Sequence, residues 1–446
     1  MIIVDTALKK REAEDRPIQV GLIGAGAQAR AITRTINNST PGMRVAAIAN
    51  RNIENAEKVY AELDLTSVRC SSTEALNAAI ISRTCAVTND PIALAQSEEI
   101  DAIIEATGSL EYAARAVLVA IDGGKHVILV NAELDATIGP ILKKKADAAG
   151  VIFTSADGDQ PGTTMNLVRF LEGVGVKPVL CGNIKGFHSP YRTPLTQAGF
   201  AEKWGLQPAM VSSFADGTKL AIEQAVIANG TGMKVAKRGM IGPDFSNGDP
   251  TARLVPLDET MVAFTEHLDN HLANGGPGLV DYVIGAQPGP GVFVIGKMED
   301  PAQRHFLSYY KMGPGPYYCF HTPYHLCHFE VPGSVARAVL FADATLCPKG
   351  GATVGVIALA KKDLEPGELV DKLGGFEVYG VLENIEAIRR EDLIPIGLAI
   401  GARIKRKLAK DTPLTFDDLE IPEGRLIDAL YAEQERIFAP GPGGMK

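Results

Sequence analysis

Apolar runs that end in glycine or polar residues recur along the amino-terminal third of the chain and predict buried β-strands. The segments between them have the alanine-rich spacing of helices, as in NIENAEKVYAEL and LEYAARAVLVAIDGG. Alternation of buried strands and helices predicts a parallel sheet with helices on both faces, which is an α/β domain of the Rossmann type. The expected strands are residues 18–26, 44–50, 100–108, 125–133 and 150–157.

The pattern changes twice beyond these strands. Residues 161–347 are richer in Gly, Pro, aromatic residues and His, which is typical of an α+β domain with ligand-facing loops. Residues 348–446 alternate short strands with turns. Because 446 residues exceed what one hydrophobic core usually holds, we expect three domains, at 1–160, 161–347 and 348–446.

Composition narrows the class of protein. With 46% hydrophobic and 22% charged residues the chain reads as an ordinary globular protein. A formal net charge of -9 disfavours nucleic acid and anionic membranes as partners and favours small molecules. Six cysteines without a CxxC pair indicate reduced thiols. Since no apolar run reaches membrane-spanning length and no cleavage signal is evident, we expect a cytoplasmic protein.

A glycine-rich turn follows the first expected strand. Gly24, Gly26 and Ala29 form G-x-G-x-x-A between a strand and a helix. Gly24 permits the tight turn, and Gly26 lets a pyrophosphate approach the backbone beside Ala27 and Gln28 at the helix amino terminus. The motif therefore predicts a dinucleotide site in residues 1–160, and the alternative is a purely structural turn.

The end of the second strand indicates which dinucleotide binds. NAD sites usually carry Asp or Glu there, whereas this chain has Asn50 and Arg51. Arg51 can bind a 2′-phosphate through charge-assisted hydrogen bonds, which favours NADP(H). The alternative is that Arg51 caps a solvated loop. Further cofactor contacts are expected at the ends of the next strands, from Thr107, Gly108 and Asn131.

Two carboxylates follow the fifth strand, in FTSADGDQPGTT. Asp157 and Asp159 could converge on Mg²⁺ or Mn²⁺, with Glu133 as a third oxygen ligand. Alternatively they, with Glu133 and Gln160, contact the substrate directly. The structural alternative is an Asx turn that caps a helix beginning near Thr163.

The segment GNIKGFHSPYRTP gathers Lys185, His188, Tyr191 and Arg192. Such a cluster could bind a phosphate or carboxylate, with Arg192 as a planar fork and Lys185 as a point charge. We assign Lys185 and His188 to catalysis and Tyr191 and Arg192 to substrate binding. A solvated loop is the alternative.

A helix is expected to begin after Gly217 and to place Lys219 and Glu223 on one face. The pair could be a surface ion pair. Alternatively, Lys219 could pass a proton to a carbonyl that accepts a hydride. His325, in CFHTPYHLCHF, is expected in a pocket wall, because the His and Cys spacing there matches no structural zinc module.

Several of these motifs resemble known families. GLIGAGAQA, EATG and HVILVNAELD are similar to the nucleotide-binding domain of homoserine dehydrogenases. YYKMGPGPYYCFHTPYHL, EVPGSVARAVLFADATLCPKGG and the sequence from KKDLEPGELVDKLGG onward resemble oxidoreductases with a carboxyl-terminal SAF, or β-clip, module. Over nearly the whole chain the resemblance is to DXR-like proteins of the Brucella type, a second kind of 1-deoxy-D-xylulose 5-phosphate reductoisomerase.

The resemblance implies an NADPH-dependent reductoisomerase that forms 2-C-methyl-D-erythritol 4-phosphate in the MEP pathway of isoprenoid synthesis. We expect a homo-oligomer, most simply a homodimer, because two-fold symmetric dimers are the commonest assemblies of soluble proteins. Two departures stand out. Ordinary reductoisomerases have DSEH where this chain has ADGDQPG, and homoserine dehydrogenases have a lysine where this chain has Glu133. A homoserine dehydrogenase-like oxidoreductase acting on another small hydroxy or oxo acid is the alternative, and a noncatalytic NADP-binding sensor is a third.

Overall fold

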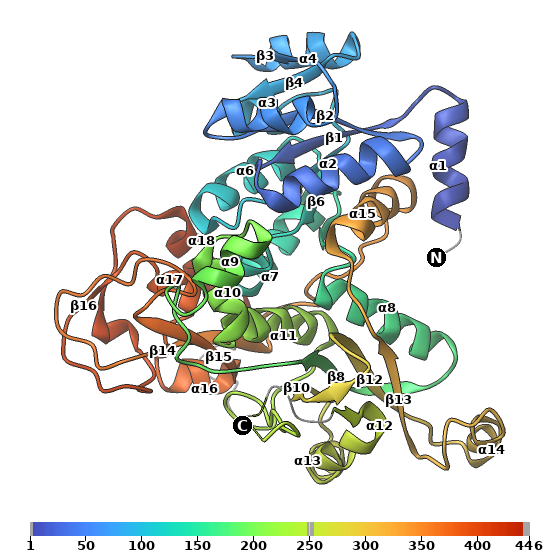
Figure 1. Cartoon of the computed structure of the whole chain (residues 1–446), viewed down its shortest axis with the longest axis vertical. Coiled ribbons are helices and arrows are strands. Elements are labelled where there is room, and N and C mark those ends of the chain that lie inside the picture. The colour runs from blue at the N-terminus through green and yellow to red at the C-terminus, as the bar shows by residue number, and fades with distance from the viewer. Residues whose placement is uncertain (1–2, 248, 250–253, 440–446) are drawn as a thin grey trace. The chain divides into compact units, whose positions relative to one another are not determined.

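The computed structural model of the chain describes residues 3–247, 249 and 254–439 (Figure 1). Contacts divide the chain into two compact units. Unit 1 comprises residues 1–159, 326–350 and 424–446, and unit 2 comprises residues 160–325 and 351–423. The three-domain division drawn from the sequence stays a prediction beside this interleaved arrangement.

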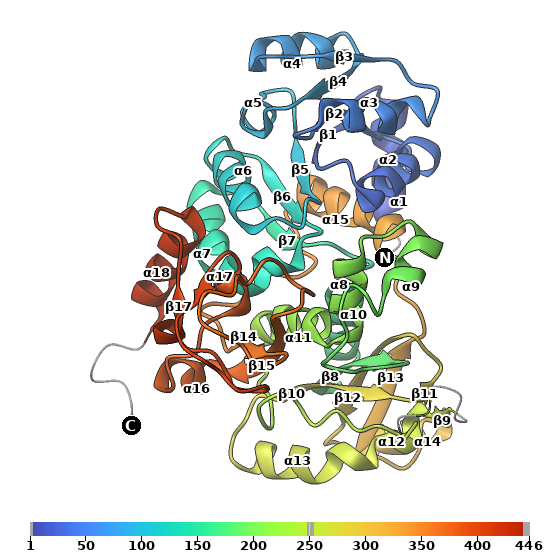
Figure 2. The ribbon, with the colours of Figure 1, turned by 60° about the vertical axis from the view of Figure 1, so that its left-hand side comes forward.

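Unit 1 is built on a seven-stranded, all-parallel sheet in the order β3-β4-β2-β1-β5-β6-β7 (Figure 2). The Rossmann-type α/β fold expected from the sequence is therefore confirmed. Each of the five expected strands is present, and the short strands β3 and β4 are additional. The strands are β1 (Ile18–Ile23), β2 (Met43–Ala49), β3 (Ser67–Arg69), β4 (Cys85–Thr88), β5 (Ala102–Glu105), β6 (His126–Leu129) and β7 (Phe153–Ser155).

Helices cover this sheet, and two of them come from distant parts of the chain. α15 packs against α2, and its Val331 and Val335 share a core with Ile32. α18 packs against α6 and α7. The helices of unit 1 are α1 (Ile3–Ala13), α2 (Ala27–Ser39), α3 (Ile53–Ala61), α4 (Thr73–Ile81), α5 (Pro91–Ala95), α6 (Leu110–Asp122), α7 (Ala132–Ala149), α15 (Cys327–Phe341) and α18 (Leu426–Phe438).

Unit 2 contains a mixed four-stranded sheet in the order β10-β8-β12-β13, in which β8 and β10 are parallel. α8 and α11 pack on this sheet and on each other. The strands are β8 (Lys177–Lys185), β10 (Leu279–Ile284), β12 (Gly291–Lys297), β13 (Tyr317–Thr322) and the short pair β9 (Val255–Pro256) and β11 (Ala286–Gln287). The helices are α8 (Gln160–Gly173), α9 (Ala198–Trp204), α10 (Pro208–Ala215), α11 (Thr218–Thr231), α12 (Leu257–Thr260), α13 (Val262–Ala273) and α14 (Pro301–Tyr309).

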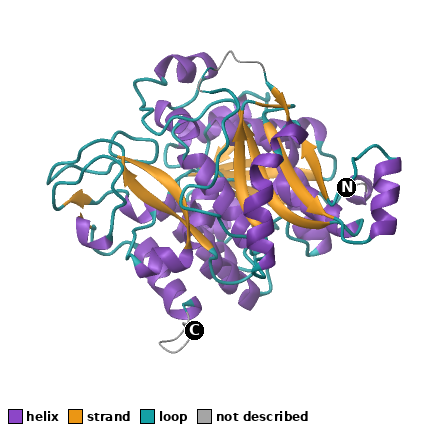
Figure 3. Ribbon diagram, turned by 90° about the horizontal axis from the view of Figure 1, so that it is seen from below, coloured by secondary structure: helices purple, strands orange, loops and turns teal. Residues whose placement is uncertain are grey.

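Residues 351–423 complete unit 2 with an antiparallel hairpin and long loops (Figure 3). Both hairpin strands contact α11. The elements are β14 (Val354–Ala360), β15 (Val378–Asn384), α16 (Ile385–Arg390), α17 (Ile396–Ala399), β16 (Arg403–Ile404), the 3₁₀ turn Phe416–Asp418 and β17 (Leu419–Glu420). The SAF-like identity of this region stays a prediction. Among the described helices of the chain, none combines the length and apolar character needed to cross a membrane.

Candidate active site

The glycine-rich turn joins β1 to α2 in unit 1. Gly24 has a φ of +114°, and a Cβ there would lie 2.9 Å from the carbonyl oxygen of Ala106. Gly26 precedes α2 without a side-chain cap, and no atom lies within 4 Å of the place its Cβ would take. Gly26, Ala27 and Gln28 are exposed, so the first N–H groups of the helix are open to a phosphate. The turn therefore fits the pyrophosphate of a dinucleotide.

The end of β2 carries the two residues expected to select the dinucleotide. Asn50 donates through Nδ2 to the carbonyl oxygen of Asn52 at 2.7 Å, and the Asn52 side chain caps α3. Arg51 is exposed between them. An exposed guanidinium in this turn suits a 2′-phosphate. Preference for NADP(H) over NAD(H) stays a prediction.

Glu105, at the carboxyl end of β5, is fully buried and was missed in the sequence. Its Oε1 accepts hydrogen bonds from the backbone N–H of Thr107 at 2.8 Å and from the Thr107 hydroxyl. Oε2 is buried without a hydrogen-bond partner among the described residues, and burial raises the pKa of Glu105 to about 7. Next to it, Asn131 caps α7 and donates to the carbonyl oxygen of Ser109 at 3.3 Å. Thr107 and Asn131 are thus held by buried polar contacts.

Asp157 is buried after β7 and is tied to α15. Its backbone N–H donates to Ser334 Oγ at 2.7 Å, and its Oδ1 accepts from the N–H of Gly158 at 2.9 Å. The Oδ2 atom lies 3.9 Å from Nη1 of Arg337, which also pairs with Asp343. Arg337 is the only charged residue of SVARAVLF, a signal that could have identified it in the sequence.

Asp159 and Glu133 are both partly exposed, Glu133 in the first turn of α7. Within the part of the chain that the structure describes, no three His, Cys, Asp or Glu side chains form a group suited to a metal ion. Metal binding by Asp157 and Asp159 stays a prediction. No step of the reaction proposed below passes through a metal.

Unit 2 brings four polar side chains together, which we call the polar cluster: Gln160, Asn183, Lys185 and Glu223. Lys185 Nζ donates to Gln160 Oε1 at 2.6 Å and to Glu223 Oε2 at 3.2 Å. Asn183 Nδ2 donates to the same two oxygens, at 2.8 and 3.0 Å. Gln160, Asn183 and Glu223 are almost fully buried, whereas the Lys185 side chain is 20% exposed. The cluster therefore holds one cation on a partly exposed side chain.

Lys219 lies in the first turn of α11, as predicted from the sequence. It is partly exposed, and it precedes Glu223 by one helical turn. Residues four apart share a face of a helix, so Lys219 lies on the side of α11 that carries the polar cluster. Lys219 therefore shares a helix face with Glu223, the buried carboxylate of the cluster.

His188 lies beyond the end of β8, and its imidazole ring makes polar contacts. Nδ1 lies 3.3 Å from the hydroxyl of Tyr282, and the ring bonds to the backbone of Asp216. Burial lowers the pKa of His188 and raises that of Tyr282 to about 12. One hydrogen bond joins the two side chains, and which of them donates depends on the tautomer of the imidazole.

Tyr191 and Arg192 lie farther along the same loop with separate partners. The Tyr191 hydroxyl donates to Asp411 Oδ2 at 2.9 Å. The Arg192 guanidinium lies 4.7 Å from the centre of the Phe187 ring. The structure therefore gives Lys185, His188, Tyr191 and Arg192 distinct surroundings along one loop.

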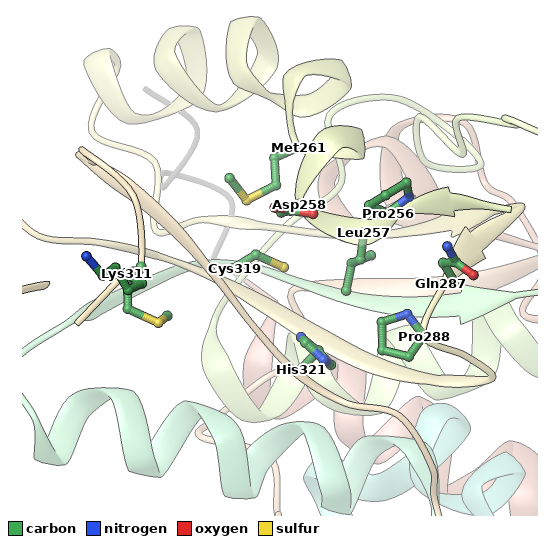
Figure 4. A pocket seen from close by; sticks show the side chains of 10 residues that line it. Pro256, Leu257, Asp258, Met261, Gln287, Pro288, Lys311, Cys319 and His321 are labelled. Carbon is green, nitrogen blue, oxygen red and sulfur yellow. The ribbon is translucent and has the colours of Figure 1, made fainter. Parts of the chain in front are cut away.

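The described residues of unit 2 enclose a cavity of about 360 Å³ beside His188. It is lined by Gly217, which caps α11, by Leu220 and Ala221 of α11, and by residues 379–382 of β15. A larger hollow, of about 510 Å³, contains none of the residues predicted for the site (Figure 4). His325 lies outside both linings, and its Nδ1 is buried without a hydrogen-bond partner among the described residues.

Two family models match the chain. Residues 24–155 match the NAD-binding domain of homoserine dehydrogenase, and residues 158–331 match "Oxidoreductase DRL, catalytic domain". A homoserine dehydrogenase of Neisseria gonorrhoeae is 28% identical over 137 residues, which are 31% of this chain and 28% of that protein. The chain thus carries a dehydrogenase-type dinucleotide-binding domain joined to a segment similar to an oxidoreductase catalytic domain.

Solved structures of Rossmann-type oxidoreductases resemble parts of the chain. A probable dehydrogenase from Thermotoga maritima is 15% identical with a TM-score of 0.35, covering 63% of this chain and 72% of that one. DOX-P reductoisomerase in complex with NADPH, fosmidomycin and magnesium is 14% identical with a TM-score of 0.33, covering 47% and 57%. Myo-inositol dehydrogenase from Lactobacillus casei is 19% identical with a TM-score of 0.29, covering 40% and 49%.

Proposed function

We propose that the protein is an NADPH-dependent oxidoreductase and, within that class, a reductoisomerase that converts 1-deoxy-D-xylulose 5-phosphate to 2-C-methyl-D-erythritol 4-phosphate. The polar cluster carries the proposal. It sets the Lys185 ammonium beside a buried carboxylate, within the segment similar to the DRL catalytic domain. The glycine turn of unit 1 supports the cofactor, because its open helix terminus suits a pyrophosphate.

The reaction has two parts. The ketose phosphate rearranges to a branched aldehyde, and the aldehyde carbon then takes a hydride while its oxygen takes a proton. The nicotinamide supplies the hydride when it is bound. Lys185 stabilises negative charge on the substrate oxygens, since Gln160 and Glu223 hold its ammonium in place. Lys219 holds the proton that passes to the aldehyde oxygen.

Substrate phosphate is assigned to the loop after β8. Arg192 is the proposed ligand because a guanidinium forms two parallel hydrogen bonds with a phosphate. Contact with the Phe187 ring limits the freedom of the Arg192 side chain before the substrate arrives. His188 and Tyr191 belong to the same loop and are the other proposed substrate contacts there.

A homoserine dehydrogenase-like reaction is the second candidate. The Neisseria gonorrhoeae relative and the NAD-binding match both favour it. It would use the same two lysines on a smaller substrate without a phosphate. The two candidates differ in whether Arg192 contributes to substrate binding.

A substrate panel separates the candidates. Purified full-length protein is incubated with NADPH, with and without Mg²⁺ or Mn²⁺, and separately with 1-deoxy-D-xylulose 5-phosphate, aspartate semialdehyde and a set of hydroxy acids, while absorbance of the cofactor is followed. We expect NADPH oxidation with the sugar phosphate and a product identical to 2-C-methyl-D-erythritol 4-phosphate by mass and NMR. Turnover confined to aspartate semialdehyde would refute the reductoisomerase, and tight NADPH binding without any turnover would favour a sensor.

A further inference from the structure

Lys361 is a buried cation of the carboxyl-terminal part of unit 2. It follows the last residue of β14, and its side chain is 2% exposed. Nζ donates to Asp216 Oδ2 at 2.8 Å, to the carbonyl oxygen of Arg192 at 2.9 Å and to that of Gly375 at 2.8 Å. An ammonium has three protons, and all three are used.

Asp216 connects Lys361 to the start of α11. Its other oxygen, Oδ1, accepts the N–H of Thr218 at 2.9 Å, which is the first residue of the helix. Gly217 between them has a φ of +89°, and a Cβ there would lie 2.4 Å from His188 Nε2. The helix start is therefore set by the Asp216 carboxylate, because Gly217 has no side chain to cap it.

The hydrogen bond from Lys361 to the carbonyl oxygen of Arg192 fixes the loop after β8. The Arg192 carbonyl oxygen also accepts from Ser212 Oγ at 3.0 Å. One ammonium thus joins the loop that carries Tyr191 and Arg192 to the helix turn that carries Lys219. A strand of the same hairpin adds a parallel link, since Gly380 N–H donates to Thr218 Oγ1 at 2.9 Å.

We infer that Lys361 is a positioning residue, which sets the first turn of α11 and the loop after β8 relative to each other so that Lys219 and Arg192 meet one substrate. A buried ion pair adds little net stability compared with apolar side chains of the same volume, whereas it fixes geometry strongly. The inference rests on the proposed function for the roles of Lys219 and Arg192. It gives residues 351–423 an indirect part in the reaction, through the residues that Lys361 positions.

Four full-length proteins test this role: wild type, Lys361→Met, the double variant Lys361→Met with Asp216→Asn, and Lys362→Met. Lys362 is the matched control, because it is the next residue and its side chain is 49% exposed in a surface pair with Glu368. The double variant leaves no uncompensated buried charge, so it keeps its fold if Lys361→Met alone does not.

Three measurements are made on each protein. NADPH affinity is measured by fluorescence, kcat and KM are measured with 1-deoxy-D-xylulose 5-phosphate, and the labelling rate of the Lys219 amine by an amine-reactive reagent is followed across pH by peptide mass spectrometry. We expect the Lys361 variants to lose at least tenfold in kcat and to change Lys219 labelling at least threefold. NADPH affinity should stay within twofold of wild type, and Lys362→Met should match wild type throughout.

The inference is overturned if the folded double variant labels Lys219 at the wild-type rate. Failure of the proposed function gives a different result, in which the wild-type protein does not turn over the sugar phosphate. Labelling of Lys219 still decides the role of Lys361 in that case, since it needs no substrate.

Discussion

At the scale of single residues, the charged side chains of this chain differ in how far they are exposed to solvent. Arg51 is exposed beside the glycine turn, where it can meet a ligand from solvent. Glu105 and Asp135 are fully buried in unit 1, and burial raises the pKa of each to about 7. Lys185 lies between these extremes, because its side chain is 20% exposed and its ammonium is hydrogen-bonded to Gln160 and Glu223. Arg51 is thus open to a ligand, whereas Glu105 and Asp135 are closed off from solvent.

Arg51→Asp should weaken NADPH much more than NADH. A charge-assisted hydrogen bond contributes roughly 1.5–3 kcal/mol, so we expect the Kd for NADPH to rise about 10- to 100-fold. The Kd for NADH should change by less than about threefold, because NADH has no 2′-phosphate. Fluorescence titration of both cofactors measures this.

Arg83→Asp is the matched control for Arg51→Asp. Arg83 is exposed and pairs with Asp15, so its replacement changes the net charge equally without touching the turn after β2. Equal losses for both cofactors in Arg51→Asp would contradict the 2′-phosphate assignment.

Sequence patterns predicted those site residues whose place depends only on their neighbours along the chain. Gly24, Gly26 and Lys219 lie where their motifs predicted, at a turn and in the first turn of a helix. Glu105 escaped notice, because a carboxylate at the end of an apolar strand reads as the exposed end of that strand. Its burial depends on neighbouring strands, and those come from distant parts of the sequence.

At the scale of elements, the turn between β1 and α2 contains two glycines in different surroundings. Gly24 needs its positive φ and its close approach to Ala106. Gly26 has an ordinary φ of -77° and open space around it. The backbone conformation therefore requires glycine at the first position, and we expect ligand binding to require it at the second.

Gly24→Ala and Gly26→Ala should therefore differ. Gly24→Ala should lower the free energy of unfolding by at least ~1–2 kcal/mol, the cost of a left-handed residue with a side chain, and should also weaken NADPH. Gly26→Ala should keep wild-type stability and raise the Kd for NADPH about tenfold or more, because its methyl group occupies the place of the pyrophosphate. Thermal unfolding and fluorescence titration check both, and equal stability losses would argue against this division.

The elements themselves were partly predictable. Five strands of unit 1 were predictable because each lies in an apolar run of the sequence, and the residues of these runs are buried. β3 and β4 were not predictable in this way, since two of the three residues of β3 are exposed and the apolar run of β4, CAV, has only three residues. α11 was predicted from Gly217 and its helical spacing, whereas its link to Lys361 depends on a contact between residues 145 positions apart.

At the scale of the whole molecule, buried acids make stability depend on pH. Burial raises the folded-state pKa of Asp135 to about 7, from 3.8, so the folded protein binds a proton that the unfolded chain releases between these pH values. Stability from Asp135 is therefore greatest below about pH 4 and falls as the pH rises toward 7, by roughly 1.4 kcal/mol per unit of pKa difference.

Asp135→Asn should remove this dependence. We expect urea unfolding, followed by circular dichroism between pH 4.5 and 7.5, to show a smaller decline in stability for Asp135→Asn than for wild type. Asp122→Asn is the control, because Asp122 is exposed at the end of α6. Parallel curves for all three proteins would show that Asp135 is ionised in the folded state.

The return of residues 326–350 to unit 1 also affects how the protein is made. Thr154 Oγ1 bonds to the carbonyl oxygen of Leu346, which lies 192 residues farther along the chain. α15 contributes to the core beside α2, so this core is complete only after that helix has left the ribosome. During synthesis the apolar face of α2 stays uncovered until α15 has been made. In that interval the nascent chain is open to aggregation and to binding by chaperones.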